Sequence, residues 1–333
     1  MTVDKEKMLN FVLNDISRVR ILVVGDVMLD KYYYGEVSRI SPEAPVPINH
    51  VTVINDTMGG SANVAHNLAL LGCKTSIAGF VGNDYHCQTL LDKFTSRGID
   101  YKGIIHRDAP TTTKLRIIGG HQQMLRLDFE DTEPVGEQYA QRLVNFVEQS
   151  LQMGLDAVIL SDYGKGACTH EVCTSIVEAC QEMSVPVFVD PKGTEWEKYA
   201  GADYITPNFK ELNAVQAKPI RNRDEYIEPA AQYVMDKYDL KHVLATRSEC
   251  GMSLVQPSAG IVHIPTKAQE VFDVSGAGDT VIAVFALGIA GGLQPVEAAY
   301  LANLAASVVV AKLGTYAVSN AELQRVLLGT SKA

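Results

Sequence analysis

Short apolar runs, each ending in a polar residue or a glycine, constrain the fold of this chain more than any other feature. They are Ile21–Val24, Ala157–Leu160, Val185–Val189 and His242–Ala245. Runs of this kind are typical of parallel strands that are buried on both faces. Helical patterns lie between them, at Asn63–Leu71, Glu137–Gln149, Glu171–Met183 and Asp224–Tyr238. The alternation predicts an α/β fold, a doubly wound, mostly parallel sheet with helices on both faces.

The strand ends indicate where a ligand binds. The runs are followed or closed by Gly25-Asp26, Ser161-Asp162, Asp190-Pro191 and Thr246-Arg247. Ligands of open α/β sheets bind outside the carboxyl ends of the strands. We therefore expect the functional site at this edge of the sheet.

Two stretches, about 32–55 and 101–129, break the alternation. They carry β-branched and alternating segments such as Thr113–Ile117 and Met124–Asp128, which are typical of strands with one exposed face. They predict a small β-sheet lid on the main body. The sequence has no internal repeat or long linker, so we expect one domain over residues 1–333.

Composition excludes several classes of function. The net charge of −10 over 333 residues disfavours a nucleic-acid partner. No apolar signal segment opens the chain, and its longest apolar runs are about half a membrane span, so we expect a cytoplasmic protein that binds no membrane. The scattered cysteines are expected to be reduced packing residues and not zinc ligands, and His66 and His121 to be structural.

The segment Ser275–Val281, SGAGDTV, is the strongest chemical signal. A glycine-rich turn before an apolar helix directs backbone N–H groups at an anion, and the helix dipole adds to the attraction. Asp279 would repel a bound phosphate unless it acts on a hydroxyl beside it. The segment thus predicts a phosphotransferase whose phosphate cradle contains its own base.

Two other segments precede helices and allow two interpretations each. Gly59-Gly60-Ser61-Ala62-Asn63 is either a tight turn or a place where the backbone approaches a ligand and Asn63 contacts a hydroxyl. Asn208 and Glu211 form either a capping box or a pair that holds the water shell of Mg²⁺.

Several charged residues also allow two interpretations, one structural and one functional. Asp30 can accept hydrogen bonds from sugar hydroxyls or cap a turn. Lys165 and Lys192 lie on glycine-containing loops at strand ends, where they are either solvated surface groups or phosphate ligands. Arg116 and Arg126, on the expected lid, could bind phosphate in the same way.

Other nucleotide-binding motifs are absent from the sequence. It has no GxxxxGK[ST] loop, no protein-kinase motif set and no GxGxxG after the first strand.

The two glycine segments resemble the signatures of the ribokinase-like (PfkB) carbohydrate kinases, and the resemblance covers nearly the whole chain. It implies that Asp279 is the catalytic base and that Gly276, Ala277 and Gly278 form the anion hole. It places Asp30, Gly59, Gly60 and Asn63 in the sugar pocket. It also implies a lid that is often shared across a homodimer.

The same resemblance places the cofactors, ATP and Mg²⁺. The ATP phosphates and Mg²⁺ would lie near Asn208, Phe209, Lys210 and Glu211. Thr246, Ser248 and Gly251 are expected to border the nucleotide, with Asn303 near the adenine.

Further segments look like the heptose-7-phosphate kinases: Ser38–Pro47, His121–Gln123, Leu125–Asp128 and Asp162–Gly166. Such enzymes make the 1,7-bisphosphate used in ADP-heptose synthesis for lipopolysaccharide, and in many bacteria they are fused to a nucleotidyltransferase. No HxGH motif of such a transferase occurs here, so a stand-alone kinase or a kinase half is expected. Met28 and the tight glycine signature argue against free ribose or fructose as substrate.

The resulting hypothesis is ATP-dependent phosphorylation of the anomeric hydroxyl of D-glycero-D-manno-heptose 7-phosphate. A kinase of another sugar phosphate, such as a hexose phosphate, and a non-catalytic nucleotide or sugar sensor are the alternatives. The sequence does not rank Lys165, Lys192, Arg116 and Arg126 as ligands of the sugar's own phosphate.

Overall fold

Two separate β-sheets organise the chain, which the computed structural model describes over residues 3–257, 260–268, 270–312 and 314–329. The larger sheet has nine strands in the order β13-β12-β11-β10-β9-β8-β1-β4-β5. Its strands are β1 Arg20–Gly25, β4 Lys74–Val81, β5 Asp100–His106, β8 Ala157–Ser161, β9 Val187–Asp190, β10 Tyr204–Ile205, β11 His242–Thr246, β12 Met252–Gln256 and β13 Gly260–Ile264. The β11–β12 and β12–β13 pairs are antiparallel, and the other pairs of this sheet are parallel.

The central strand β1 explains why the sheet needs helices on both faces. Ile21 and Val23 belong to one hydrophobic cluster, and Leu22 and Val24 belong to the other. All four side chains are completely buried. Since neighbouring strand residues point to opposite faces, β1 separates two cores, and the predicted doubly wound sheet is confirmed.

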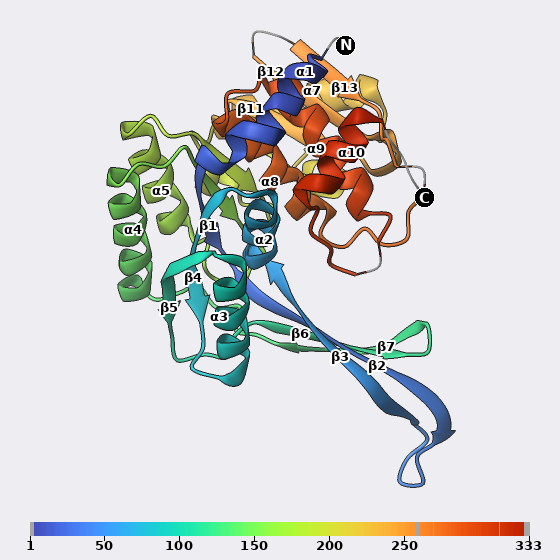
Figure 1. Ribbon diagram of the computed structural model, residues 1–333. Coiled ribbons are helices and arrows are strands. Elements are labelled where there is room, and N and C mark those ends of the chain that lie inside the picture. Colours follow the sequence, from blue (N-terminus) through green and yellow to red (C-terminus); the bar gives the residue numbers. More distant parts are fainter. Residues whose placement is uncertain (1–2, 258–259, 269, 313, 330–333) are drawn as a thin grey trace.

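Each core is covered by its own set of helices (Figure 1). The first set is α1 Lys5–Asn10, α2 Ser61–Leu71, α3 Tyr85–Arg97, α8 Ala277–Ala290, α9 Pro295–Val309 and α10 Asn320–Leu328. The second set is α4 Glu137–Gln152, α5 His170–Glu182, α6 Phe209–Ala214 and α7 Asp224–Tyr238. In the described part of the chain, no helix combines the length and the hydropathy that a membrane span requires.

The smaller sheet projects from the body as the predicted lid (Figure 1). Its strand order is β3-β2-β6-β7, with β2 Val27–Ile40, β3 Pro47–Gly60, β6 Thr113–Gly119 and β7 Gln122–Phe129. The bases of β2 and β3 meet the body at the carboxyl end of β1.

One predicted boundary of the lid is wrong. Residues 101–106 lie in β5, which pairs in parallel with β4 at the edge of the main sheet. β5 mixes exposed and buried residues, as the lid strands do, although Ile104 and Ile105 pack against different cores, so the sequence pattern does not separate the two. The lid strands run from 27 to 60 and from 113 to 129.

Candidate functional site

Asp279 lies in the first turn of α8 and is only 5% exposed. The helix is preceded by Gly276, whose φ of 78° is in the left-handed region. A Cβ there would lie 2.9 Å from Asn63 Nδ2, so the position demands glycine for both conformation and space. Gly278 is exposed, and a Cβ there would meet open space.

Two side chains hold the Asp279 carboxylate. Asn63 Nδ2 donates to Oδ2 at 2.6 Å, and the Tyr163 hydroxyl donates a short hydrogen bond to Oδ1. Burial raises the pKa of Asp279 to about 6, and the charge of Asp30 acts in the same direction. The two hydrogen bonds lower this pKa, but burial outweighs them. The carboxyl is therefore ionised at neutral pH and still basic enough to accept a proton.

The Gly59-Gly60 turn places Asn63 by close backbone approach. Gly60 has a φ of 54°, and a Cβ on it would lie 2.5 Å from the backbone oxygen of Asp26. A Cβ on Gly59 would lie 2.6 Å from Asp30 Oδ2. Both glycines are thus needed where the chain passes from β3 into α2, which begins at Ser61, and the turn brings Asn63 toward Asp279.

Asp30 joins the lid to this centre. It is buried in β2, and Arg116 of β6 donates to its Oδ1 at 2.6 Å. The Arg116 guanidinium also lies over the Tyr32 ring, 5.1 Å from its centroid. The Tyr32 hydroxyl lies 3.3 Å from Thr315 Oγ1, in the body beside Gly276. The predicted residues Asp30, Arg116, Asn63 and Asp279 therefore share one neighbourhood.

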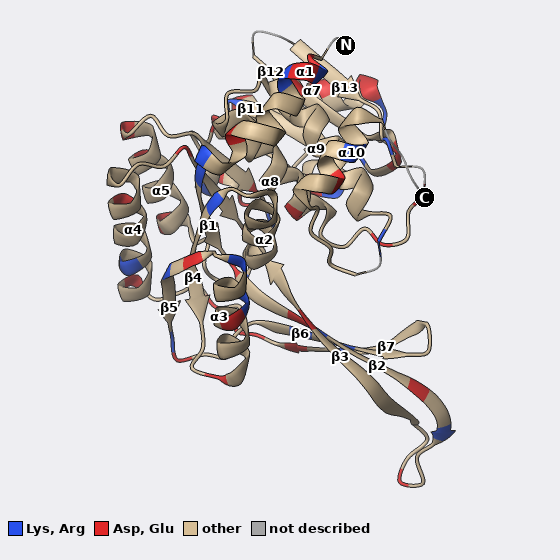
Figure 2. Cartoon of the chain, viewed as in Figure 1, with Lys and Arg blue, Asp and Glu red and all other residues tan. Residues whose placement is uncertain are grey.

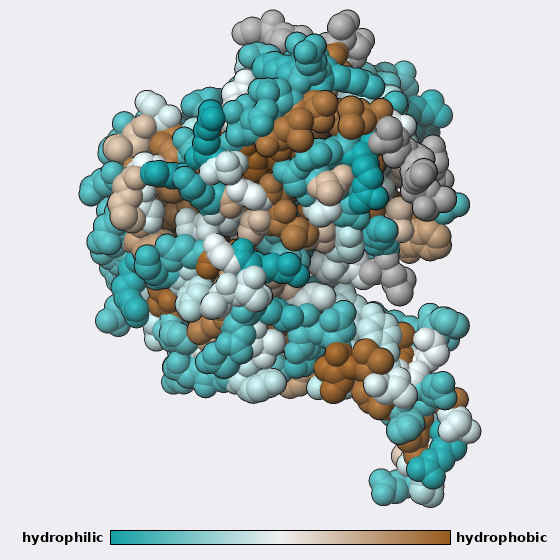
Figure 3. Space-filling model, in the orientation of Figure 1, coloured by the Kyte–Doolittle hydropathy of each residue, from teal (hydrophilic) through white to brown (hydrophobic). Residues whose placement is uncertain are grey.

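The strand register gives the lid two unlike faces. Asp30, Tyr32, Lys114, Arg116, Arg126 and Asp128 share the face toward Thr315, because paired residues of adjacent strands point to the same side. The opposite face carries Tyr33, Ile54, Ile117, Leu125 and Leu127. Figure 2 shows charged segments gathered near the base of the lid, and Figure 3 shows apolar patches along it.

The predicted phosphate ligands separate into two groups. Lys165 Nζ reaches Glu130 at the foot of the lid at 2.8 Å, and Arg126 binds Asp128 through two nitrogens at 2.8 and 2.9 Å. Lys192 instead reaches Glu211 Oε1 at 3.2 Å. Its partner places Lys192 with the predicted nucleotide residues and not with the lid.

Asn208 and Glu211 do form a capping box at the start of α6. Asn208 Oδ1 accepts the Glu211 N–H, and Glu211 Oε2 accepts the Asn208 N–H, both at 3.0 Å. This leaves Glu211 Oε1, whose partner is the half-exposed Lys192. Within the described ranges, no group of three or more His, Cys, Asp and Glu side chains is arranged to hold a metal directly.

Asp190, at the end of β9, is a further carboxyl group in this region. Burial raises its pKa well above the usual range, and the charges of Asp279 and Glu211 act in the same direction. Crowded carboxylates of this kind favour a bound divalent cation. Glu211 and Asp190 therefore have the chemistry to hold the water shell of a Mg²⁺ ion.

The other predicted nucleotide residues follow the same edge of the sheet. Asn208 and Thr246 form an isolated parallel bridge. Gly251, with a φ of 77°, faces the backbone at Ile264 and Thr266, and Asn303 donates to Pro265 O at 2.8 Å. Ser248 and Lys210 are exposed, whereas Phe209 packs against the second core and so supports α6.

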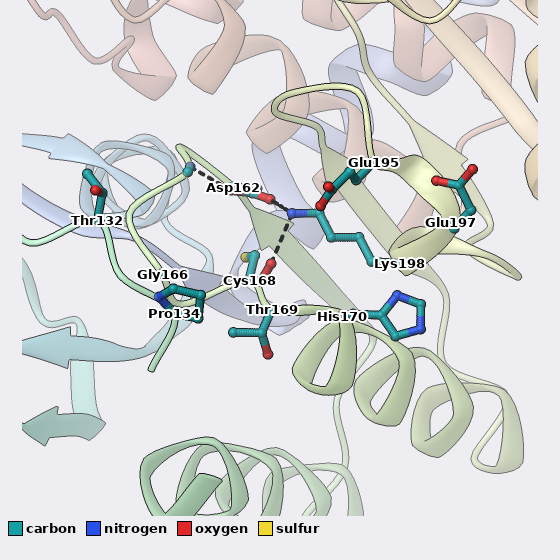
Figure 4. A pocket seen from close by; sticks show the side chains of 11 residues that line it. Thr132, Pro134, Asp162, Gly166, Cys168, Thr169, His170, Glu195, Glu197 and Lys198 are labelled. Carbon is teal, nitrogen blue, oxygen red and sulfur yellow. Dashed lines mark hydrogen bonds and ion pairs between the residues drawn. The ribbon is translucent and has the colours of Figure 1, made fainter. Parts of the chain in front are cut away.

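The loop between β8 and α5, residues 162–169, contains the main residue that the sequence did not single out. Tyr163 and Lys165 point toward Asp279 and Glu130. Residues 162, 164, 166 and 168 instead line a cavity of about 410 Å³ (Figure 4). In that cavity Asp162 is already neutralised by Lys198 at 2.5 Å and hydrogen-bonded by Tyr199 at 2.6 Å. The loop thus separates the cavity from the predicted base.

Known proteins match this arrangement over most of the chain. The family model described as pfkB family carbohydrate kinase matches residues 19–322. The bifunctional protein HldE of Trichlorobacter lovleyi is 44% identical over 318 residues, which are 95% of this chain and 64% of that protein. The chain thus spans less than two thirds of that relative's length.

Solved structures match the fold at lower identity. Phosphofructokinase-2 from Escherichia coli, in complex with substrates and products, has a TM-score of 0.76 at 19% identity, covering 94% of this chain and all of that one. Arabidopsis thaliana ribokinase, complexed with ribose and ATP, has a TM-score of 0.72 at 20% identity, covering 93% and 98%. The fold is ribokinase-like, and by its family match this chain belongs to the pfkB family of carbohydrate kinases.

Proposed function

We propose that the chain transfers the γ-phosphoryl group of ATP to the anomeric hydroxyl of D-glycero-D-manno-heptose 7-phosphate. The product would be the 1,7-bisphosphate for ADP-heptose and lipopolysaccharide synthesis in the cytoplasm. The observation that carries the proposal is the buried Asp279 carboxylate, in the first turn of α8 and close to the lid residue Asp30.

Asp279 accepts the proton of the sugar hydroxyl as that oxygen bonds to phosphorus. Of the predicted anion hole of Gly276, Ala277 and Gly278, the Ala277 N–H already donates to Val274 O at 3.2 Å. The N–H groups of Gly278 and Asp279, which have no acceptor within the helix, are available in the first turn of α8 for the phosphoryl oxygens. When bound, Mg²⁺ neutralises phosphate charge, and Asn208, Glu211 and Asp190 would hold its water shell.

The polar face of the lid supports a sugar that carries its own phosphate. Arg116 and Arg126 lie directly opposite each other on β6 and β7, and like charges at such positions repel unless an anion lies between them. They are two residues beyond the row of Asp30, or about 7 Å along the strand. We assign the sugar phosphate to this arginine pair, with Asp30 binding the ring hydroxyls.

Three observations support heptose as the sugar. The segments 38–47, 121–123 and 162–166 resemble the heptose-7-phosphate kinases. The relatives named bifunctional protein HldE agree with a kinase that is often fused to a second enzyme. The arginine pair on the lid suits a sugar that carries a phosphate of its own, as heptose 7-phosphate does.

The apolar face of the lid supports a homodimer. Ile54, Leu125, Leu127 and Phe129 are between 40% and 58% exposed. Exposed apolar patches on a sheet mark interaction sites, and a second copy offers the same surface. We propose that two lids pack through these faces.

A substrate panel with ATP and Mg²⁺ tests the function. We expect ADP release with heptose 7-phosphate, and little with fructose 6-phosphate, tagatose 6-phosphate, fructose 1-phosphate or ribose. Turnover of a hexose phosphate alone would replace the heptose assignment by that sugar. ATP binding without turnover of any sugar would favour a sensor.

A further inference from the structure

Tyr163 contacts the proposed base, yet the reaction described above gives it no role. We propose that Tyr163 is a positioning residue for phosphoryl transfer, whose phenol holds Asp279 Oδ1 so that the carboxylate stays ionised and oriented toward the sugar hydroxyl. This inference rests on the proposed kinase function and deepens it.

The loop that carries Tyr163 is fixed by another buried carboxylate. Asp26 is 3% exposed and accepts the N–H groups of Tyr163, Lys165 and Ala167 at 2.7, 3.0 and 3.1 Å. Three hydrogen bonds to one side chain hold alternate residues of the loop on the same side. The body of the protein therefore positions the Tyr163 hydroxyl beside Asp279, and this position does not depend on the lid.

The two donors of Asp279 leave room for a third hydrogen bond. Each carboxylate oxygen accepts two, and Tyr163 and Asn63 occupy one on each oxygen. A sugar hydroxyl can take a remaining position without displacing either donor. In the transfer step its proton passes to Asp279, its oxygen bonds to phosphorus, and the bond from phosphorus to the ADP oxygen breaks. Tyr163 keeps its proton throughout.

The charges around Asp279 explain why such a donor is useful. Asp30 from β2 faces Asp279 with negative charge, and burial also favours the protonated form of Asp279. Tyr163 acts in the opposite direction. Asp190 from β9 is the other carboxyl group nearby, and the charge of Asp279 helps to raise its pKa. Burial and the charge of Asp279 raise the pKa of the Tyr163 phenol well above its usual value, so the phenol remains the donor at every working pH.

The test is the pH profile of kcat for Tyr163→Phe. Without the phenol, we expect the acidic midpoint of the profile to move up by about one unit, since a hydrogen bond to a charged group changes the equilibrium by about tenfold or more. We also expect kcat at neutral pH to fall while KM for ATP stays unchanged. A profile that coincides with that of the wild type would overturn the proposal.

Tyr199→Phe is the matched control. Its phenol is also buried and donates to an aspartate, Asp162, at 2.6 Å. It loses a comparable hydrogen bond to a carboxylate, together with the one that its oxygen accepts from the Lys192 N–H at 3.2 Å. It therefore reports the structural cost of losing a buried phenol, and its midpoint should equal that of the wild type. A shift as large as that of Tyr163→Phe would mean that any loosening of the loop moves the profile, which also overturns the proposal.

A second measurement does not depend on turnover. Carbon-13 carboxyl NMR follows the titration of Asp279, assigned with Asp279→Asn, in the wild type and in a protein carrying 3-fluorotyrosine at position 163. The fluorinated phenol is a stronger donor and should lower the midpoint; an unchanged midpoint contradicts the inference. If the wild type phosphorylates no sugar, the proposed function fails, and this titration still decides the role of Tyr163.

Discussion

Asp279 in the body and Arg126 on the lid both carry an ionisable group with side-chain partners, yet their surroundings are opposite. The Asp279 side chain is buried and is held by an amide and a phenol, both of them neutral. The Arg126 side chain is 49% exposed and is held by the charge of Asp128. The body thus holds the Asp279 carboxylate in one geometry, whereas Arg126 on the lid can exchange Asp128 for another anion.

The difference follows from the cost of each arrangement. An exposed ion pair contributes about 0–1 kcal/mol, so the phosphate of a substrate can displace Asp128 from Arg126 at little cost. A buried carboxylate that loses its donors has no water to replace them. The body can therefore hold the proposed base in one geometry while Arg126 on the lid exchanges Asp128 for a substrate.

Asp279→Asn should have the largest effect. We expect kcat to fall about 10²- to 10⁴-fold, because the base that accepts the hydroxyl proton is lost. KM for ATP should change little, since Asn208, Thr246 and Gly251 lie elsewhere on the sheet edge. A coupled ADP-release assay measures this. Near-wild-type turnover in the folded variant would show that Asp279 is not the base.

The same substitution should stabilise the fold at neutral pH. The pKa of Asp279 is raised from 3.8 to about 6 by burial, so its stabilising effect is complete below about pH 4 and is lost as the pH rises through 6. The cost at pH 8 is about 3 kcal/mol by the conversion of pKa shifts. Urea unfolding should show Asp279→Asn more stable than the wild type at pH 8 and nearly equal at pH 4.5. The exposed Asp236→Asn is the control, and a pH-independent gain in Asp279→Asn would contradict the expectation.

On the lid, Arg126→Gln should raise KM for the sugar phosphate by about tenfold, the value of one charge-assisted hydrogen bond. KM for ATP should not change, because the nucleotide residues belong to the body. Arg39→Gln, which removes the same charge from the exposed part of β2, is the matched control. An equal rise in both variants would mean that the lid acts through its total charge and not through the arginine pair.

Asp279 and the strand ends were predictable from the sequence because the patterns that indicate them are local. A glycine turn before an apolar run places Asp279 at a helix start whatever the rest of the chain does, and the strand ends follow from short apolar runs. The structure confirms Asp279 in the first turn of α8 and the polar residues at the carboxyl ends of β1, β8, β9 and β11.

The remaining contacts depend on register and on long-range packing. Tyr163 and Asp279 are 116 residues apart, and no local pattern distinguishes this tyrosine from a packing residue. The Asp30–Arg116 pair requires the parallel pairing of β2 with β6, which a sequence does not specify. The capping box at Asn208 shows a third limit, since the same motif stabilises the helix and leaves Glu211 Oε1, which contacts Lys192, outside the capping hydrogen bonds.

The smallest effect on the chemistry is expected from the apolar face of the lid, where Leu125→Glu should separate the proposed dimer. The side chain is 50% exposed and shares a row with Ile54, Tyr33 and Ile117, so a buried charge there would oppose lid-to-lid packing. Sedimentation should show a monomer, and Leu13→Glu, at a comparably exposed leucine of the body, should leave the assembly intact. Because the polar face of each lid meets its own body through Tyr32 and Thr315, the monomer should retain its kcat. A monomer that has lost activity would show instead that the lid of the second copy completes the site. In that case sugar binding by the lid would not be independent of the chemistry at Asp279.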